Sequence, residues 1–186
     1  MNNYKELSKK IASETGEVLG RVEPSEVELL IEEILKAEKI FLFGVGRVFL
    51  ALKCFGKRLG QTGFDCQVVG SITEKPITAK DLIIIASGSG ESKLPVEIAR
   101  IAKSKGAKLG LITSAGESTL KKTADFAVHL PCPTKVDAKT GVRTIQAMTV
   151  LFDQSLHLFG DVVSMLLQER KGIKNEDMWK FHANLE

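Results

Sequence analysis

Residues 82–92 read LIIIASGSGES, an apolar run that breaks abruptly into glycine and serine. A short, unbroken apolar run is typical of a strand that is buried on both faces, as in a parallel sheet. The glycines that follow permit a tight turn, and serine is favoured where a helix begins. We therefore expect Leu82–Ala86 to be a central strand, with a helix starting soon after the serine- and glycine-rich loop.

The same alternation of strand and helix patterns extends on both sides of this stretch. Apolar runs predict strands, and amphipathic segments between them predict helices. The expected strands cover residues 39–43, 66–69, 82–86, 108–112 and 126–130, and the helices between them cover 49–59, 94–102 and 118–122. Strands that alternate with helices indicate βαβ units, so the fold class is α/β with a parallel sheet.

Helical segments flank this pattern at both ends of the chain. Residues 1–37 contain two amphipathic helices, and a loop over 131–141 leads into a long helix whose apolar positions run from Ile145 to Leu166. We expect residues 171–186 to be a C-terminal helical tail, a linker followed by a short helix. Because 186 residues is an ordinary length for one domain, we expect residues 1–186 to be a single domain.

The composition limits which partners and which cellular compartment we expect for this protein. The net charge is only +3 and basic residues are interleaved with acids, so we expect no nucleic-acid partner. The three cysteines, Cys54, Cys66 and Cys132, are odd in number and lack metal-ligand spacing, which indicates free thiols and no metal site. We see no signal peptide and no apolar run near the ~20 residues that span a bilayer, and we expect a cytoplasmic protein without membrane contact.

Small and hydroxylated residues gather where the strands end. Ligands bind outside the carboxyl ends of the strands in open parallel sheets. The candidate phosphate-binding residues at these ends are Gly46, Arg47, Ser87, Gly88, Ser89, Ser92, Ser114 and Ser118. Glycine N–H groups, serine hydroxyls and the N-termini of the following helices together make a phosphate cradle. The alternative is that these residues only form tight turns and helix caps.

The sequence does not indicate that the bound phosphate belongs to a nucleotide. The run Gly44-Val45-Gly46 lacks the further glycine of a dinucleotide fingerprint, since Phe49 stands in its place. The second strand is not followed by an acid that could hold a ribose, and no lysine follows the glycines of the Ser87 loop as a P-loop requires. A small phosphorylated metabolite fits better.

These residues resemble the sugar isomerase (SIS) domain family, in which a Ser-Gly-Ser-Gly-x-Ser/Thr loop holds a substrate phosphate. Ser87, Ser89 and Ser92 match that loop. Ser114 and Ser118 match a second serine pair. The resemblance implies a three-layer αβα sandwich with a five-stranded parallel sheet and flavodoxin-like topology. Within the family the chain is most similar to the 6-phospho-3-hexuloisomerases, through residues 43–47, 58–59, 69–70, 87–92, Gln146, Met148, Phe152, Gln154 and the ending 182–186.

That resemblance implies an activity and an assembly. A small phosphorylated sugar, a 3-ketohexose 6-phosphate, would be interconverted with fructose 6-phosphate in the ribulose monophosphate route, without a cofactor. The enzyme would be a homotetramer built from dimers, with sites near subunit contacts. The chain departs from the family pattern at Val48, Phe49, Ser71, 147–150 and Asp153, where the family has glutamate. The alternatives are therefore a noncatalytic phosphosugar-binding or regulatory SIS protein, and an isomerase of another sugar phosphate.

Isomerisation needs a base that moves a proton between neighbouring carbons through a cis-enediol. Asp153 lies on the long helix among apolar residues, where burial strengthens a carboxylate as a base; it could instead be hydrogen-bonded at a subunit boundary. Glu91 lies in the phosphate loop, but could merely complement a helix dipole. His182 matches the family's C-terminal ending and could act in a neighbouring subunit. Arg47 could bind the phosphate or sugar hydroxyls, or lie on a helix surface.

Overall fold

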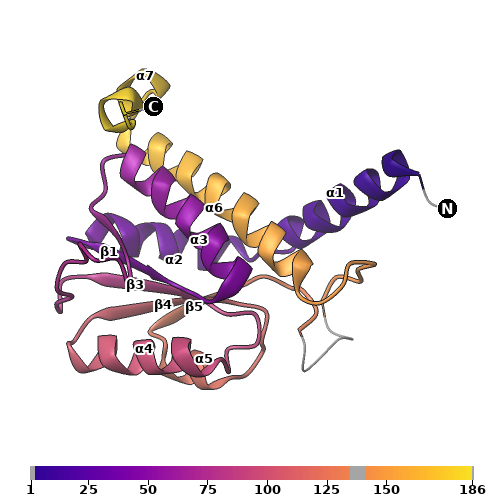
Figure 1. Ribbon diagram of the computed structural model, residues 1–186, viewed down its shortest axis with the longest axis horizontal. Coiled ribbons are helices and arrows are strands. Elements are labelled where there is room, and N and C mark those ends of the chain that lie inside the picture. The colour runs from indigo at the N-terminus through magenta and orange to yellow at the C-terminus, as the bar shows by residue number, and fades with distance from the viewer. Residues whose placement is uncertain (1–2, 135–140, 186) are drawn as a thin grey trace.

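The computed structural model describes residues 3–134 and 141–185, and its centre is a five-stranded sheet (Figure 1). The strands are β1 (Ile40–Phe43), β2 (Cys66–Val68), β3 (Leu82–Ala86), β4 (Lys108–Thr113) and β5 (Phe126–His129). All pairings are parallel and the strand order is β2-β1-β3-β4-β5, which is the flavodoxin-like order. The fold class expected from the sequence is confirmed.

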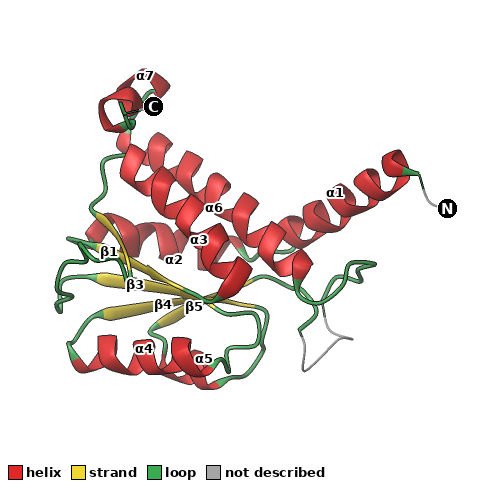
Figure 2. Ribbon diagram, in the orientation of Figure 1, coloured by secondary structure: helices red, strands yellow, loops and turns green. Residues whose placement is uncertain are grey.

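Helices cover both faces of the sheet (Figure 2). One face packs against α4 (Lys93–Ser104) and α5 (Thr119–Thr123). The other packs against α2 (Pro24–Lys36), α3 (Gly46–Gln61) and α6 (Val150–Lys171). Side chains of a strand alternate between the two layers, as the pleat requires: Ile40 and Leu42 join the α3 and α6 side, and Phe41 and Phe43 join the α4 side.

Two segments lie outside these layers. The N-terminal helix α1 (Tyr4–Gly20) packs against α6 and projects away from the sheet (Figure 1). The tail forms α7 (Asn175–Met178) and the short 3₁₀ helix η1 (Trp179–Phe181), which contacts α3. The loop expected over 131–141 falls partly on residues 135–140, which lie outside the described residues.

The helix α6 differs from the sequence-based expectation in where it starts. It starts at Val150, although the apolar pattern begins at Ile145, because residues 144–149 form a loop in which Met148 takes a φ of 59°. It is also 22 residues long and apolar enough to cross a membrane by length and composition, although Asp153 and Asp161 interrupt its apolar residues. Its most apolar window is 56% buried within the structure, and α6 packs against α1, α2 and α3, as a core helix does.

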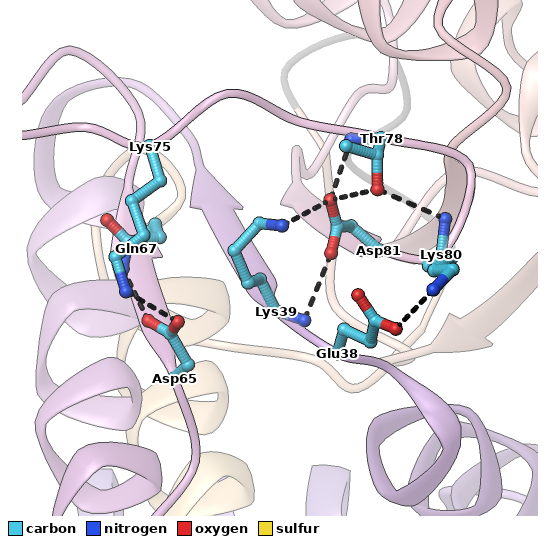
Figure 3. Close-up of polar contacts among 8 residues, drawn as sticks. All are labelled: Glu38, Lys39, Asp65, Gln67, Lys75, Thr78, Lys80 and Asp81. Atoms are coloured by element: carbon cyan, nitrogen blue, oxygen red, sulfur yellow. Dashed lines mark hydrogen bonds and ion pairs between the residues drawn. The ribbon is translucent and has the colours of Figure 1, made fainter.

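At the edge of the sheet away from the Ser87–Ser92 loop, a buried carboxylate joins the starts of β1 and β3 (Figure 3). Asp81 accepts hydrogen bonds from the N–H of Lys39 at 3.1 Å and from the N–H and hydroxyl of Thr78 at 2.6 and 2.8 Å. The Lys39 ammonium lies 3.1 Å from the same carboxylate, whose side chain is fully buried. Burial alone would raise the pKa of Asp81, but the bonds from Thr78 and Lys39 outweigh it and hold that pKa below its ordinary value.

Replacing Asp81 with asparagine is expected to lower the free energy of unfolding by about 2–4 kcal/mol, because Lys39 keeps its charge and loses its buried partner. Since the folded pKa of Asp81 is depressed, its contribution is complete above the unfolded pKa and is lost as pH falls through the folded pKa. Denaturant unfolding should therefore show the wild type and Asp81→Asn converging in strong acid. The control is Glu38→Gln, which removes an exposed pair with Lys80 and should leave stability nearly unchanged. An Asp81 variant as stable as that control would contradict this account.

Candidate active site

Three helices begin at the carboxyl edge of the sheet, around one pocket of about 400 Å³. The pocket is lined by Val45, Gly46, Arg47, Val48, Ala86, Ser87, Gly88, Ser89, Ser92, Met148, Thr149, Val150, Phe152 and Asp153. The N-cap residues of α3, α4 and α6 are Val45, Ser92 and Thr149, and none of them makes a side-chain capping bond. Unsatisfied N–H groups and positive dipole ends therefore converge on the pocket, which favours an anion.

The Ser87–Ser92 loop is held in shape mostly by its own backbone and by β4. The Ser87 hydroxyl accepts a bond from the N–H of Gly90 at 3.1 Å, and Gly90 has a φ of 66°, which suits glycine. The buried hydroxyl of Thr113 donates to the Ser87 carbonyl at 2.8 Å. These bonds fix the turn, while Ser89 and Ser92 line the pocket.

An ion pair forms the wall of the pocket beside this loop. Arg47, in the first turn of α3, donates from Nε to the Asp153 carboxylate of α6 at 3.0 Å. Asp153 is 7% exposed, whereas the Arg47 side chain is 65% exposed. The guanidinium therefore fixes the orientation of the Asp153 carboxylate. The two residues also border a larger, mainly apolar groove of about 890 Å³ between α1, α3 and α6, whose lining is unsuited to a phosphate.

The structure thus brings together seven of the residues singled out in the sequence: Gly46, Arg47, Ser87, Gly88, Ser89, Ser92 and Asp153. Ser114 and Ser118 do not line this pocket. Ser114 is buried behind the loop and its N–H donates to the Gly88 carbonyl at 3.2 Å. Ser118 is the N-cap of α5 and accepts from the N–H of Lys121 at 3.1 Å. For Ser118 the structure therefore shows the helix cap that the sequence left open as an alternative.

Glu91 is directed away from the pocket, toward the start of α5. Its carboxylate accepts bonds from the N–H and the hydroxyl of Thr119 at 2.7 and 2.8 Å. These two bonds hold the pKa of Glu91 below its ordinary value. Within one chain, Glu91 is therefore a clamp between the loop and α5 rather than a base in the pocket. Glu91 precedes the N-cap of α4, and its carboxylate complements the N-terminus of α5 instead.

His182 lies at the other end of α3. Its ring is 5.1 Å from the ring of Trp179 and, with Arg58 and Gln61, it borders a separate hollow of about 300 Å³. Arg58 belongs to the last turn of α3, whereas Arg47 belongs to the first. Eleven residues of helix separate Arg47 from Arg58, about 16 Å, so His182 lies well away from the Ser87–Ser92 loop of the same chain.

The chain is similar to known proteins over most of its length. Residues 33–158, more than half of the chain, match the SIS domain family. The chain belongs to the SIS family. Its relatives include proteins named 3-hexulose-6-phosphate isomerase. The one from Bacillus subtilis (strain 168) is 40% identical over 87% of both chains, and the one from Mycobacterium gastri is 32% identical over 95% of this chain and 88% of the relative. A hypothetical protein of Methanococcus jannaschii, whose crystal structure was taken to infer a function of 3-hexulose-6-phosphate isomerase, superposes with a TM-score of 0.84 at 25% identity, covering 97% and 99% of the two chains.

The SIS pocket also contains residues that sequence reasoning did not select. Thr113, at the end of the buried strand β4, fixes the Ser87–Ser92 loop through its hydroxyl, and that hydroxyl at a strand end was the signal that could have found it. Thr149 and Val150, which the sequence analysis named only as departures from the resemblance, also line the pocket at the start of α6. Among the described residues, no group of three His, Cys, Asp or Glu side chains is placed to hold a metal ion. The arrangement offers an anion cradle, one buried carboxylate and one arginine.

Proposed function

We propose that this protein is a phosphosugar isomerase that interconverts a 3-ketohexose 6-phosphate and fructose 6-phosphate. The observation that carries the proposal is the shared pocket, in which the Ser87–Ser92 loop lies beside the Arg47–Asp153 pair. A loop for the phosphate and a base for the sugar are the two parts that such a reaction requires. The names of the relatives in Bacillus subtilis and Mycobacterium gastri support the choice of substrate.

The phosphate binds to the loop in this proposal. The backbone N–H groups of Gly88 and Ser89, the hydroxyls of Ser89 and Ser92 and the N-terminus of α4 are the groups available to it. Anchoring one end of the substrate fixes the distance between its reacting carbons and the base, which supplies part of the rate enhancement.

Asp153 is the base in this proposal. It removes the proton from C2 of the 3-ketose, which gives a 2,3-enediol, and it returns a proton to C3 while the hydroxyl proton moves from O2 to O3. Arg47 holds the carboxylate through Nε, and the remaining guanidinium N–H groups can stabilise the oxyanion that develops on the sugar. One carboxylate serves both carbons because they are adjacent.

The test is conversion of a panel of sugar phosphates by the purified protein. The 3-ketohexose 6-phosphate should yield fructose 6-phosphate at roughly 1–10³ per second, the ordinary range for enzymes, and pentose and heptose phosphates should react more slowly. Faster conversion of arabinose or sedoheptulose phosphate would assign that sugar phosphate as the substrate in place of the 3-ketohexose 6-phosphate. Binding without any conversion would leave a noncatalytic phosphosugar-binding protein.

We further propose that residues 1–186 form a single SIS domain that works as a homo-oligomer, a tetramer built from dimers, in the cytoplasm. Exposed apolar side chains along the groove between α1, α3 and α6 support association, including Tyr4, Leu50 and Leu158. Association would also bring His182 of one copy to the pocket of another. The three free cysteines support a reducing compartment. Light scattering measures the assembly, and a 20.3 kDa species alone would contradict it.

A further inference from the structure

A buried carboxylate on α1 holds the loop that leads into α6. Glu14 is 2% exposed, and both of its oxygens are occupied. Oε2 accepts from the Thr144 hydroxyl at 2.6 Å and from the Gln146 side-chain amide at 3.2 Å, while Oε1 accepts from the N–H of Ile145 at 3.1 Å. Three consecutive residues of one loop therefore converge on a single side chain that is about 130 residues away in the sequence.

This carboxylate is satisfied by neutral donors. No lysine or arginine of the described segments lies within ion-pair distance of Glu14. Burial by itself raises the pKa of Glu14, but the bonds from residues 144–146, assisted by the charge of Lys10, hold it below its ordinary value. The group is therefore ionised at neutral pH and makes charge-assisted bonds, which are stronger than bonds between neutral groups.

The anchored loop continues directly into the wall of the pocket. Only Ala147 separates Gln146 from Met148, and Met148, Thr149 and Val150 all line the pocket. Met148 has a φ of 59° and is the one non-glycine residue with a positive φ in the described part of the chain. A side-chain-bearing residue holds this conformation only where its surroundings impose it. The bonds to Glu14 constrain one side of Met148, and the start of α6 constrains the other.

We propose that Glu14 is a positioning residue for the sugar, because its bonds to residues 144–146 set the conformation of the pocket wall formed by 148–150. This inference rests on the proposed function, since the ligand is the sugar phosphate of that pocket. The Ser87–Ser92 loop is held by other contacts, and Asp153, whose N–H donates to the Thr149 carbonyl, is also held by its bond from Arg47. Loss of the anchor should therefore weaken sugar binding more than it slows the chemical step.

Two substitutions disturb the anchor, that is, the bonds between Glu14 and residues 144–146: one changes the acceptor and the other removes a donor. Glu14→Gln keeps the length of the side chain but puts an NH₂ donor among three donors, so at least one bond is lost. Thr144→Val removes the hydroxyl that donates to Glu14 and accepts from the N–H of Gln146 at 3.0 Å. The matched control is Glu17→Gln on the exposed face of the same helix, where the carboxylate pairs only with Arg21 among the contacts of the described residues.

The experiment measures kcat and KM with the 3-ketohexose 6-phosphate and, separately, Kd for fructose 6-phosphate by calorimetry. In both Glu14→Gln and Thr144→Val we expect KM and Kd to rise about tenfold, with kcat falling less than about threefold. Glu17→Gln should match the wild type. Thermal unfolding checks that each variant is folded. If one of the two variants fails to fold, the KM and Kd of the other test the role of Glu14.

The outcomes separate this inference from the proposed function. Anchor variants whose KM and Kd equal those of the Glu17→Gln control, or a loss confined to kcat, would overturn the role of Glu14. A wild type that binds fructose 6-phosphate but does not convert the 3-ketose would overturn the proposed function, and the Kd comparison would still decide on Glu14. A wild type that binds no sugar phosphate would overturn both.

Discussion

Replacing Asp153 with asparagine should lower kcat about 10²–10⁴-fold and leave KM within a few-fold of the wild-type value. Asparagine retains the size of the side chain and an oxygen that can accept from Arg47, but it cannot take a proton from the sugar. In the proposed function the Ser87–Ser92 loop binds the substrate phosphate through separate groups, so binding should survive. Steady-state kinetics with the 3-ketohexose 6-phosphate, together with calorimetry on fructose 6-phosphate, measure both quantities.

The same helix offers a matched control for that change. Asp161 lies two turns further along α6, has a side chain that is 41% exposed, and pairs with Arg58 rather than lining the pocket. Asp161→Asn should turn over within about twofold of the wild type, because exposed ion pairs contribute little. If Asp153→Asn retains the activity of this control, Asp153 is not the base and the reaction must be assigned to another group, of which His182 from a second copy is the first candidate.

Replacing Gly90 with alanine should damage both the fold and the phosphate site. An added Cβ would lie 2.1 Å from the hydroxyl and 2.5 Å from the Cβ of Ser118, and the φ of 66° disfavours any side chain. Ser118 cannot move freely, because it is buried and caps α5. We expect a loss of about 2–4 kcal/mol in the free energy of unfolding, from overpacking and the left-handed backbone together. Affinity for fructose 6-phosphate should fall at least about tenfold, since the loop must shift.

Gly116 provides the comparison for this prediction. It lies in the neighbouring loop before α5, has no positive φ, and has open space where a Cβ would be added. Gly116→Ala should therefore unfold at nearly the wild-type denaturant concentration and bind fructose 6-phosphate normally. Equal stability and equal affinity in the two alanine variants would show that the Ser87–Ser92 turn tolerates a side chain, contrary to the contacts described above.

The parts of the fold that local pattern encodes were predictable. The strands and the loop after β3 follow from apolar runs that end in glycine and serine, and the structure places them as expected. The start of α6 was not predictable in this way. Apolar spacing from Ile145 is compatible with a helix, but Glu14 binds residues 144–146 from another element and Met148 takes a left-handed conformation. Tertiary contacts overrode the local periodicity there.

The site residues, too, include some that local sequence predicts and others that only the tertiary structure brings together. Residues that follow one strand, such as Ser87 and Ser89, could be grouped from sequence alone because parallel strands end at one edge. The pair formed by Arg47 and Asp153 joins residues 106 positions apart, and no local pattern encodes it. Glu91 is adjacent to the loop in sequence, yet its bonds to Thr119 of α5 turn its carboxylate away from the pocket.

A crystal structure of the protein with fructose 6-phosphate would test the central claim most directly, because that claim places the phosphate loop and the base in one pocket. We predict phosphate oxygens on the N–H groups and hydroxyls of residues 87–92, with C2 and C3 of the sugar within about 3.5 Å of the Asp153 carboxylate, the distance of a reactive geometry. A phosphate bound in the groove beside α1 or in the hollow beside His182 of the same chain, or sugar carbons remote from Asp153, would contradict it.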